Sequence, residues 1–311
     1  MRFQRLAALA AVSTLAASPA FAHSPQVFVS GKGADSAGCG TTAAPCRTFQ
    51  YAHDSAVTPG GMIAVMDSGD YGPVRITKSV SIVNNGAGVA AIGPNAQLSS
   101  IEVAAGADGK VVLRGLTVDG GKTGFLGLRI VSARALDVSK CGFRNFLGSG
   151  MAYEGGSDMS FRIADSEFSD NVNSGIQFAS MNEPNIDGVI RNSRFNRNGA
   201  GFLGAVFYSP FGSNRTFRVV VKDVEVNGGR AGFELTNPSP NTSLTLTGAT
   251  IGGASRAALM ASFSAPQIRL SRSVLINNLN PWEGGEGVTS SGDNQVMLSA
   301  TTLPAPIIPM K

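Results

Sequence analysis

Three short phrases of the chain carry charged side chains in the same local context. They are "DSEF" with Asp165 and Glu167, "NSRF" with Arg194, and "DVEV" with Asp223 and Glu225. Paired carboxylates can act as acid and base on a glycosidic bond, or hold Ca²⁺ through their oxygens. An arginine can bind a carboxylate through two parallel hydrogen bonds. Such chemistry requires three phrases that are far apart in the sequence to meet in space.

Histidine chemistry has little support, because the chain contains two histidines, His23 and His53. His23 would begin the mature chain after a predicted signal peptide. His53 lies on the apolar face of a predicted helix, where packing explains it. A Ser-His-Asp triad or a histidine zinc site therefore does not fit this sequence.

A repeat brings the three phrases together. Its apolar anchors lie 25, 25, 27, 31, 25 and 24 residues apart: Val118, Phe143, Phe168, Phe195, Val226, Ile251 and Leu275. Each unit has an alternating strand with the anchor, a turn with Asn or Gly, and a second short apolar run. A period in the twenties without a long helical stripe predicts a solenoid with three strands per rung. The anchors then form an inward column with a rung spacing of ~4.8 Å.

The repeat also predicts which charged residues share a face. The position before the anchor holds Glu167, Arg194 and Glu225 on successive rungs, and the position three before it holds Asp165 and Asp223. We therefore predict one outward patch over three rungs, flanked one rung earlier by Lys140 and Arg144. A site that binds or transforms a glycan is one interpretation, with Arg194, Glu167 and Glu225 as its catalytic candidates. The other is a ladder of alternating charges that avoids stacking like charges.

Aromatic residues are a second indication of sugar binding, since sugar rings pack on flat apolar faces. The longest rung, 195–226, contains the excursion "YSPFGSNRTF" with Tyr208 and Phe211. Long loops of a solenoid often build its binding face. We predict that the loop 208–216 borders the charged patch, with a loop packed over the flank as the alternative.

The stretches "VFVSGKGADSAGCGTTAAPCRTF", "YGPVRITKSVSIV" and "VVLRGLTVDGG" resemble the opening of bacterial exported β-helix repeat proteins of the pectin-lyase-like superfamily. The resemblance implies an all-β, single-stranded right-handed parallel β-helix with a short N-terminal capping α-helix. The superfamily includes lyases, hydrolases, epimerases and adhesins. The "NTD", "DD" and "GHG" motifs of polygalacturonase-like hydrolases and the "WIDH" motif of pectate lyases are missing from the repeat region, so neither activity carries over. Trp282, the sole tryptophan, is placed in a loop, and Asp119 of "TVDG" is interpreted as a turn residue.

The start of the chain predicts export. Arg2 and Arg5 precede an apolar stretch, and Ala20-Phe21-Ala22 offers small residues for cleavage after Ala22. We predict a secreted or periplasmic protein without a membrane span. The expected organisation is a signal peptide at 1–22, a cap at 23–61, a β-helix at 62–300 and a proline-rich flap at 301–311.

The predicted cap contains a short cysteine loop and a helix. Cys39 and Cys46 lie seven apart in an exported chain, which predicts a local disulfide, whereas Cys141 is interpreted as a small packed residue. A helical pattern of apolar positions follows and should plug the first rung: Phe49, Ala52, His53, Ala56 and Val57.

The charge composition limits the classes of partner that the protein is expected to bind. The net charge of +4 includes two charges of the predicted signal, so the mature chain is nearly balanced and nucleic acid is not expected. We predict a monomer that binds or processes polysaccharide, with an acidic glycan preferred and the reaction left open. No cofactor is assigned, and Ca²⁺ stays an option. If the protein is an enzyme, a lyase or epimerase is favoured over a hydrolase. The alternative is a non-catalytic cell-envelope or adhesin-like β-helix.

Overall fold

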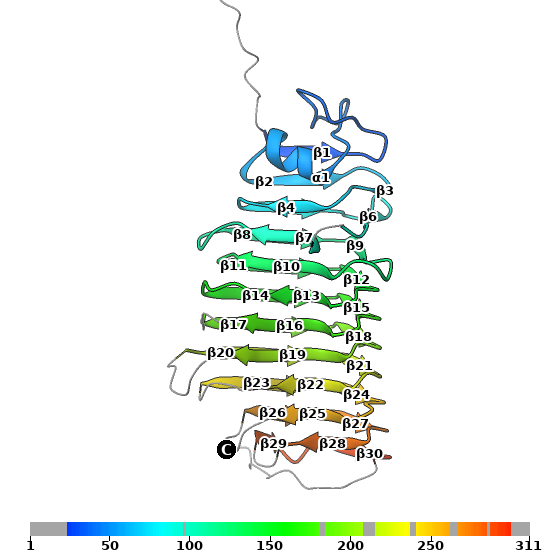
Figure 1. Ribbon diagram of the computed structural model, residues 1–311, viewed down its shortest axis with the longest axis vertical. Helices are drawn as coiled ribbons and strands as arrows, with labels where there is room; N and C mark the ends of the chain where they lie inside the picture. Colours follow the sequence, from blue (N-terminus) through cyan, green and yellow to red (C-terminus); the bar gives the residue numbers. More distant parts are fainter. Residues whose placement is uncertain are drawn as a thin grey trace, which may run out of the picture.

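The computed structural model describes residues 24–95, 98–180, 184–207, 215–236, 241–261, 267–284 and 287–299. Its strands form a right-handed parallel β-helix whose rungs stack along one long axis (Figure 1). Each complete rung passes from sheet A to sheet B and then to sheet C. The predicted fold class and the three strands per rung are confirmed.

The three sheets run the length of the solenoid. Sheet A contains β1 (Ser24–Val29), β2 (Val57–Val65), β5 (Val80–Val83), β8 (Lys110–Arg114), β11 (Ala135–Ser139), β14 (Met159–Ala164), β17 (Ile186–Arg191), β20 (Phe217–Lys222), β23 (Thr242–Thr247), β26 (Ile268–Ser271) and β29 (Val288–Ser290). Sheet B contains β3 (Gly69–Asp70), β6 (Ala90–Ile92), β9 (Leu116–Asp119), β12 (Gly142–Arg144), β15 (Glu167–Ser169), β18 (Arg194–Asn196), β21 (Glu225–Asn227), β24 (Thr250–Gly252), β27 (Val274–Ile276) and β30 (Gln295–Met297). Sheet C contains β4 (Val74–Ile76), β7 (Ser99–Ala104), β10 (Leu126–Ser132), β13 (Ser149–Tyr153), β16 (Ser174–Ser180), β19 (Ala200–Phe207), β22 (Ala231–Leu235), β25 (Ala257–Ala261) and β28 (Asn280–Glu283).

The repeat anchors form the core beneath sheet B. Phe143, Phe168 and Phe195 are fully buried and pair in register on consecutive rungs. Their rings stack with centroids 5.3 Å apart and interplanar angles of 12° and 8°. The predicted aromatic column is confirmed, and it fixes the register of the short strands on either side of each anchor.

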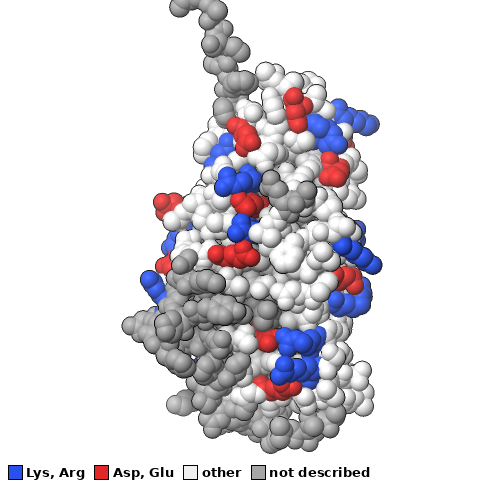
Figure 2. Space-filling model, viewed as in Figure 1, with Lys and Arg blue, Asp and Glu red and all other residues white. Residues whose placement is uncertain are grey.

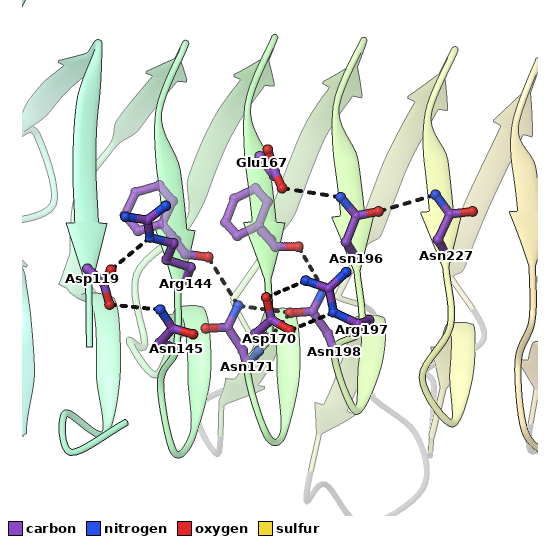
Figure 3. A network of polar contacts seen from close by, with 12 residues as sticks. Asp119, Arg144, Asn145, Glu167, Asp170, Asn171, Asn196, Arg197, Asn198 and Asn227 are labelled. Carbon is purple, nitrogen blue, oxygen red and sulfur yellow. Dashed lines mark hydrogen bonds and ion pairs between the residues drawn. The ribbon is translucent and has the colours of Figure 1, made fainter. Parts of the chain in front are cut away.

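An asparagine ladder lines the turn from sheet B to sheet C (Figure 3). The side chain of Asn198 accepts hydrogen bonds from the backbone N and Nδ2 of Asn171, and Asn171 Nδ2 also donates to the carbonyl of Phe143. The left-handed backbone of this turn lies one residue before these asparagines, at Asp170 (φ 57°) and Arg197 (φ 51°). The asparagines are therefore selected for their buried amides rather than for their backbone freedom.

The predicted helix covers the N-terminal end of the solenoid (Figure 1), and the predicted disulfide forms in the same cap. Helix α1 (Phe49–Tyr51) continues as a π-helical turn, η1 (Ala52–Ala56), and Thr48 caps it by accepting from the backbone N of Tyr51. The helix buries its apolar face and His53, as expected. Cys39 and Cys46 are bonded, with their Cα atoms 5.0 Å apart.

Some details of the two ends differ from the expectations. Residues 24–29 form β1, an unpredicted strand that pairs with β2, and β2 starts at Val57, directly after the helix. Trp282 lies in β28 and is half-buried against the core, so its assignment to a loop is wrong. The predicted signal peptide, His23 and the flap at 301–311 lie outside the described residues, and the domain bounds stay predictions.

Cys141 is buried, and burial raises the pKa of its thiol to about 11, as suits a packed residue rather than a reactive one. No helix in the described part of the chain is long and apolar enough to cross a membrane.

Candidate functional site

A groove of about 850 Å³ follows the turns from sheet A to sheet B over five consecutive rungs. Its lining brings together six residues that the sequence predicted for one patch: Lys140, Asp165, Glu167, Arg194, Asp223 and Glu225. All six side chains belong to exposed residues. The residues that the repeat predicted to share one face therefore line a concave surface.

Short strands of sheet B hold the floor of the groove. Glu167, Arg194 and Glu225 are direct neighbours in the parallel register of β15, β18 and β21. Each of these strands has three residues, so the central anchor points inward and its neighbours point outward. Gly142 and Thr250 continue the same column at the two ends.

Left-handed turn residues form the other wall. Lys140 (φ 54°), Asp165 (φ 53°), Asn192 (φ 48°) and Asp223 (φ 51°) stand three positions before the anchors. The sequence placed this position on an outward strand, which is wrong: these residues make the turn between the sheets. Asp and Asn tolerate this conformation better than most residues. The turn still directs their side chains to the groove, because all four line it.

Arg194 is held loosely in this groove. Its Nε lies 3.4 Å from Oε2 of Glu225, and its side chain is 68% exposed. By contrast, the ion pairs that Arg75, Arg129, Arg144, Arg162, Arg197, Arg218 and Arg256 make have separations of 3.0 Å or less. Glu167 instead accepts a hydrogen bond from Asn196 at 3.2 Å. Most N–H groups of the guanidinium therefore face the solvent of the groove.

A serine ladder behind the floor was missed by the sequence analysis. Ser166 Oγ accepts from the backbone N of Cys141, and Ser193 Oγ accepts from that of Ser166, both at 3.2 Å. The same position holds Val224 and Ala249 on the next two rungs, which offer no hydroxyl. The serine of "DSEF" and "NSRF", two residues before each anchor, was the signal that could have revealed it.

Arg144 lies apart from the groove. It stands after its anchor in β12, and its Nε donates to Oδ2 of Asp119 at 2.7 Å (Figure 3). Asn145 donates to the other oxygen of Asp119 at 3.0 Å. Arg144 is thus engaged by Asp119 and does not line the groove, and its role at the flank of the patch stays a prediction. Asp119 also accepts from the backbone N of Gly121, in agreement with its interpretation as a turn residue.

The predicted aromatic residues Tyr208 and Phe211 lie outside the described residues. Their segment connects the end of β19 in sheet C with the start of β20 in sheet A. The groove follows the passage from sheet A to sheet B. A role for the loop 208–216 at the groove therefore stays a prediction.

The described geometry does not assemble a metal site by itself. Within the described ranges, no three His, Cys, Asp or Glu side chains converge closely enough to hold a metal ion. The two acidic rungs of the groove are separated by the rung of Arg194.

One ladder of charged residues outside the groove, on sheet C, is continuous across four rungs. On sheet C, Glu102 accepts from Arg75 at 2.7 Å and from Arg129 at 3.0 Å, and Arg129 also binds Glu154 at 2.7 Å. Figure 2 shows the corresponding face, on which positive and negative side chains occur in small mixed groups wherever it is not grey. The described part of this face therefore offers no field of one sign to a polyanion.

Comparison with known proteins identifies the fold. No family model matches the sequence, and no curated protein matches it. The solved structure of the pectate lyase Pel9A is similar, with a TM-score of 0.60 and 15% identity, over 93% of this chain and 78% of that chain. The chain has the pectin-lyase-like β-helix fold. The A-module of the mannuronan C-5 epimerase AlgE4 from Azotobacter vinelandii also matches, with a TM-score of 0.37 and 15% identity, over 80% of this chain and 90% of that chain.

Proposed function

We propose that this protein binds a polysaccharide along the groove between sheets A and B. The observation that carries the proposal is the state of Arg194, which is exposed at the centre of an open groove and only loosely paired. Carboxylates on the adjoining rungs can accept hydrogen bonds from sugar hydroxyls. The groove thus offers both donors and acceptors to a long, hydroxyl-rich ligand.

The contrast with the other charged ladder favours a ligand over a purely structural role. In the sheet C ladder, Glu102 and Arg129 each engage two partners at hydrogen-bonding distance. Such a ladder satisfies its own charges. Arg194 stands between two glutamates and keeps a single, longer contact to one of them. A ladder built only to pair charges has no reason to leave its central cation open.

An acidic glycan fits this cation. A uronate carboxylate can replace the weak contact to Glu225 and take two hydrogen bonds from the guanidinium. Lys140 offers a second positive charge at one end of the groove. The fold shared with a pectate lyase is in line with a polysaccharide ligand.

The spacing of the carboxylates bears on which reaction the groove could catalyse. Glu167 and Glu225 stand two rungs apart, or about 10 Å, which is at or beyond the usual separation of an inverting pair of roughly 6.5–9.5 Å. Hydrolysis is therefore disfavoured. If the bound glycan is transformed, elimination or epimerisation at the uronate suits the groove better, with Arg194 next to the reacting sugar.

A binding screen of the mature protein tests the function. Alginate, polygalacturonate, glycosaminoglycans and a neutral glucan are compared by affinity electrophoresis and calorimetry, with and without Ca²⁺. The ultraviolet absorbance of an unsaturated product detects a lyase. If no glycan binds, the groove is a structural charge ladder.

Arg194→Ala should abolish or strongly weaken binding of the acidic glycan, because the ligand loses its charge-assisted partner. The melting temperature should hardly change, since an exposed pair contributes little stability. Arg218→Ala is the matched control: Arg218 is 62% exposed, is paired with Asp187 at 2.9 Å and lies on sheet A outside the groove lining. Equal losses in both variants would contradict the site.

A further inference from the structure

The positive charges of the groove lie two rungs apart, and a rung with two carboxylates separates them. In order along the axis, the charged residues are Lys140, then Asp165 with Glu167, then Arg194, then Asp223 with Glu225. The lining holds two cations and four carboxylates, so its formal net charge is −2. A groove with this balance does not attract a polyanion merely by its overall charge.

We propose that this alternation selects an alternating acidic heteropolysaccharide, in which a carboxylated sugar and a neutral sugar repeat as a disaccharide. The inference rests on the proposed function of the groove. Two rungs span about 10 Å, close to the length of an extended disaccharide. Uronates on every second sugar therefore reach Lys140 and Arg194 in turn.

The neutral sugars face the acidic rungs. One oxygen of Glu167 accepts from Asn196, and one oxygen of Glu225 accepts from Asn227, while the other oxygen of Glu225 makes the long contact to Arg194 that a uronate would replace. Each carboxylate keeps further lone pairs for the hydroxyls or amides of an uncharged sugar. Gly142 stands beside Glu167 in the same column, and no atom lies within 4 Å of the position where its Cβ would be. This glycine leaves open space for a sugar substituent.

A homopolyuronate does not match the same pattern. Its carboxylates recur on every sugar, so one that pairs with Arg194 places its neighbours against Glu167 and Glu225. Like charges about 4 Å apart repel even in bulk water, and the repulsion grows wherever the bound chain excludes water. The alternating glycan avoids this contact, since its uncharged sugars occupy those rungs.

Calorimetry with size-matched oligosaccharides tests the selection. Hyaluronan oligosaccharides carry a uronate on every second sugar, and oligogalacturonides carry one on each. At low salt and without divalent cations, we expect hyaluronan to bind at least about tenfold more tightly, with a smaller ratio at high salt. Arg194→Gln and Lys140→Gln should each weaken hyaluronan binding about tenfold.

The double variant with Glu167→Gln and Glu225→Gln gives the distinctive readout. Loss of the repulsion should bring the affinity for oligogalacturonide close to that for hyaluronan, whereas Arg218→Gln should leave the ratio unchanged. Wild-type protein that binds oligogalacturonide as tightly as hyaluronan, or that binds only neutral glycans, overturns the alternation and leaves polysaccharide binding intact. Failure to bind any glycan of the wider screen overturns the proposed function as well.

Discussion

Asn198→Ala tests how much of the stability of the solenoid depends on its buried amide ladder. Asn198 is 3% exposed. Its Oδ1 accepts from the backbone N of Asn171 at 3.2 Å and from Asn171 Nδ2 at 2.9 Å, and its own Nδ2 donates to the carbonyl of Phe168 at 2.8 Å. Alanine removes all three hydrogen bonds and leaves buried partners behind.

The expected cost follows from these contacts. A neutral hydrogen bond contributes a net 0.5–1.5 kcal/mol, and a buried group left without a partner costs about 1–3 kcal/mol. Since Asn171 Nδ2 keeps its bond to the carbonyl of Phe143, we expect the free energy of unfolding to fall by about 2–4 kcal/mol. The protection of amides on the neighbouring rungs should fall with it, because each rung depends mainly on its neighbours.

Urea unfolding and native-state hydrogen exchange measure the two effects. Asn227→Ala is the matched control, because Asn227 is exposed and its side chain donates to Asn196 (Figure 3) and to Glu225 rather than to buried groups. It should cost less than about 0.5 kcal/mol. A loss below about 1 kcal/mol for Asn198→Ala, or equal losses in the two variants, would refute the importance of the buried ladder.

Three further outcomes are expected. Phe168→Ala, which opens the aromatic column, should lower the free energy of unfolding by about 3–5 kcal/mol in urea titration, and a smaller loss than 1 kcal/mol would contradict the stacking. Ala249→Ser should raise the free energy of unfolding by about 0.5–1.5 kcal/mol, because the new hydroxyl would accept a hydrogen bond from the backbone N of Val224, as the hydroxyls of Ser166 and Ser193 do from backbone N atoms on earlier rungs. An unchanged urea midpoint would argue against the serine ladder. Burial lowers the pKa of His53 below 6.5, so the unfolded chain takes up a proton at a higher pH than the folded chain does. The free energy of unfolding should therefore fall as the pH drops below about 6.5, and in His53→Gln this pH dependence should disappear.

The repeat determined the register of the rungs from sequence alone. Anchors recurring every 24–31 residues demand that like side chains stack, because a shift by one residue would turn each anchor out of the core. The same register predicted that Glu167, Arg194 and Glu225 adjoin, and the structure confirms it. The spacing of Cys39 and Cys46 was sufficient for the disulfide, because a local loop brings the two thiols together whatever the rest of the chain does.

Only the tertiary structure decided how the residues around each anchor are used. The strands of sheet B are so short that the residue three before the anchor belongs to a left-handed turn, which alternation along a strand cannot reveal. Arg144 and Arg194 look equivalent in the sequence as exposed cations beside an anchor. One pairs tightly with Asp119, and the other stays loosely held in a groove, because the pairing depends on which side chain stands on the adjacent rung and how closely its carboxylate approaches.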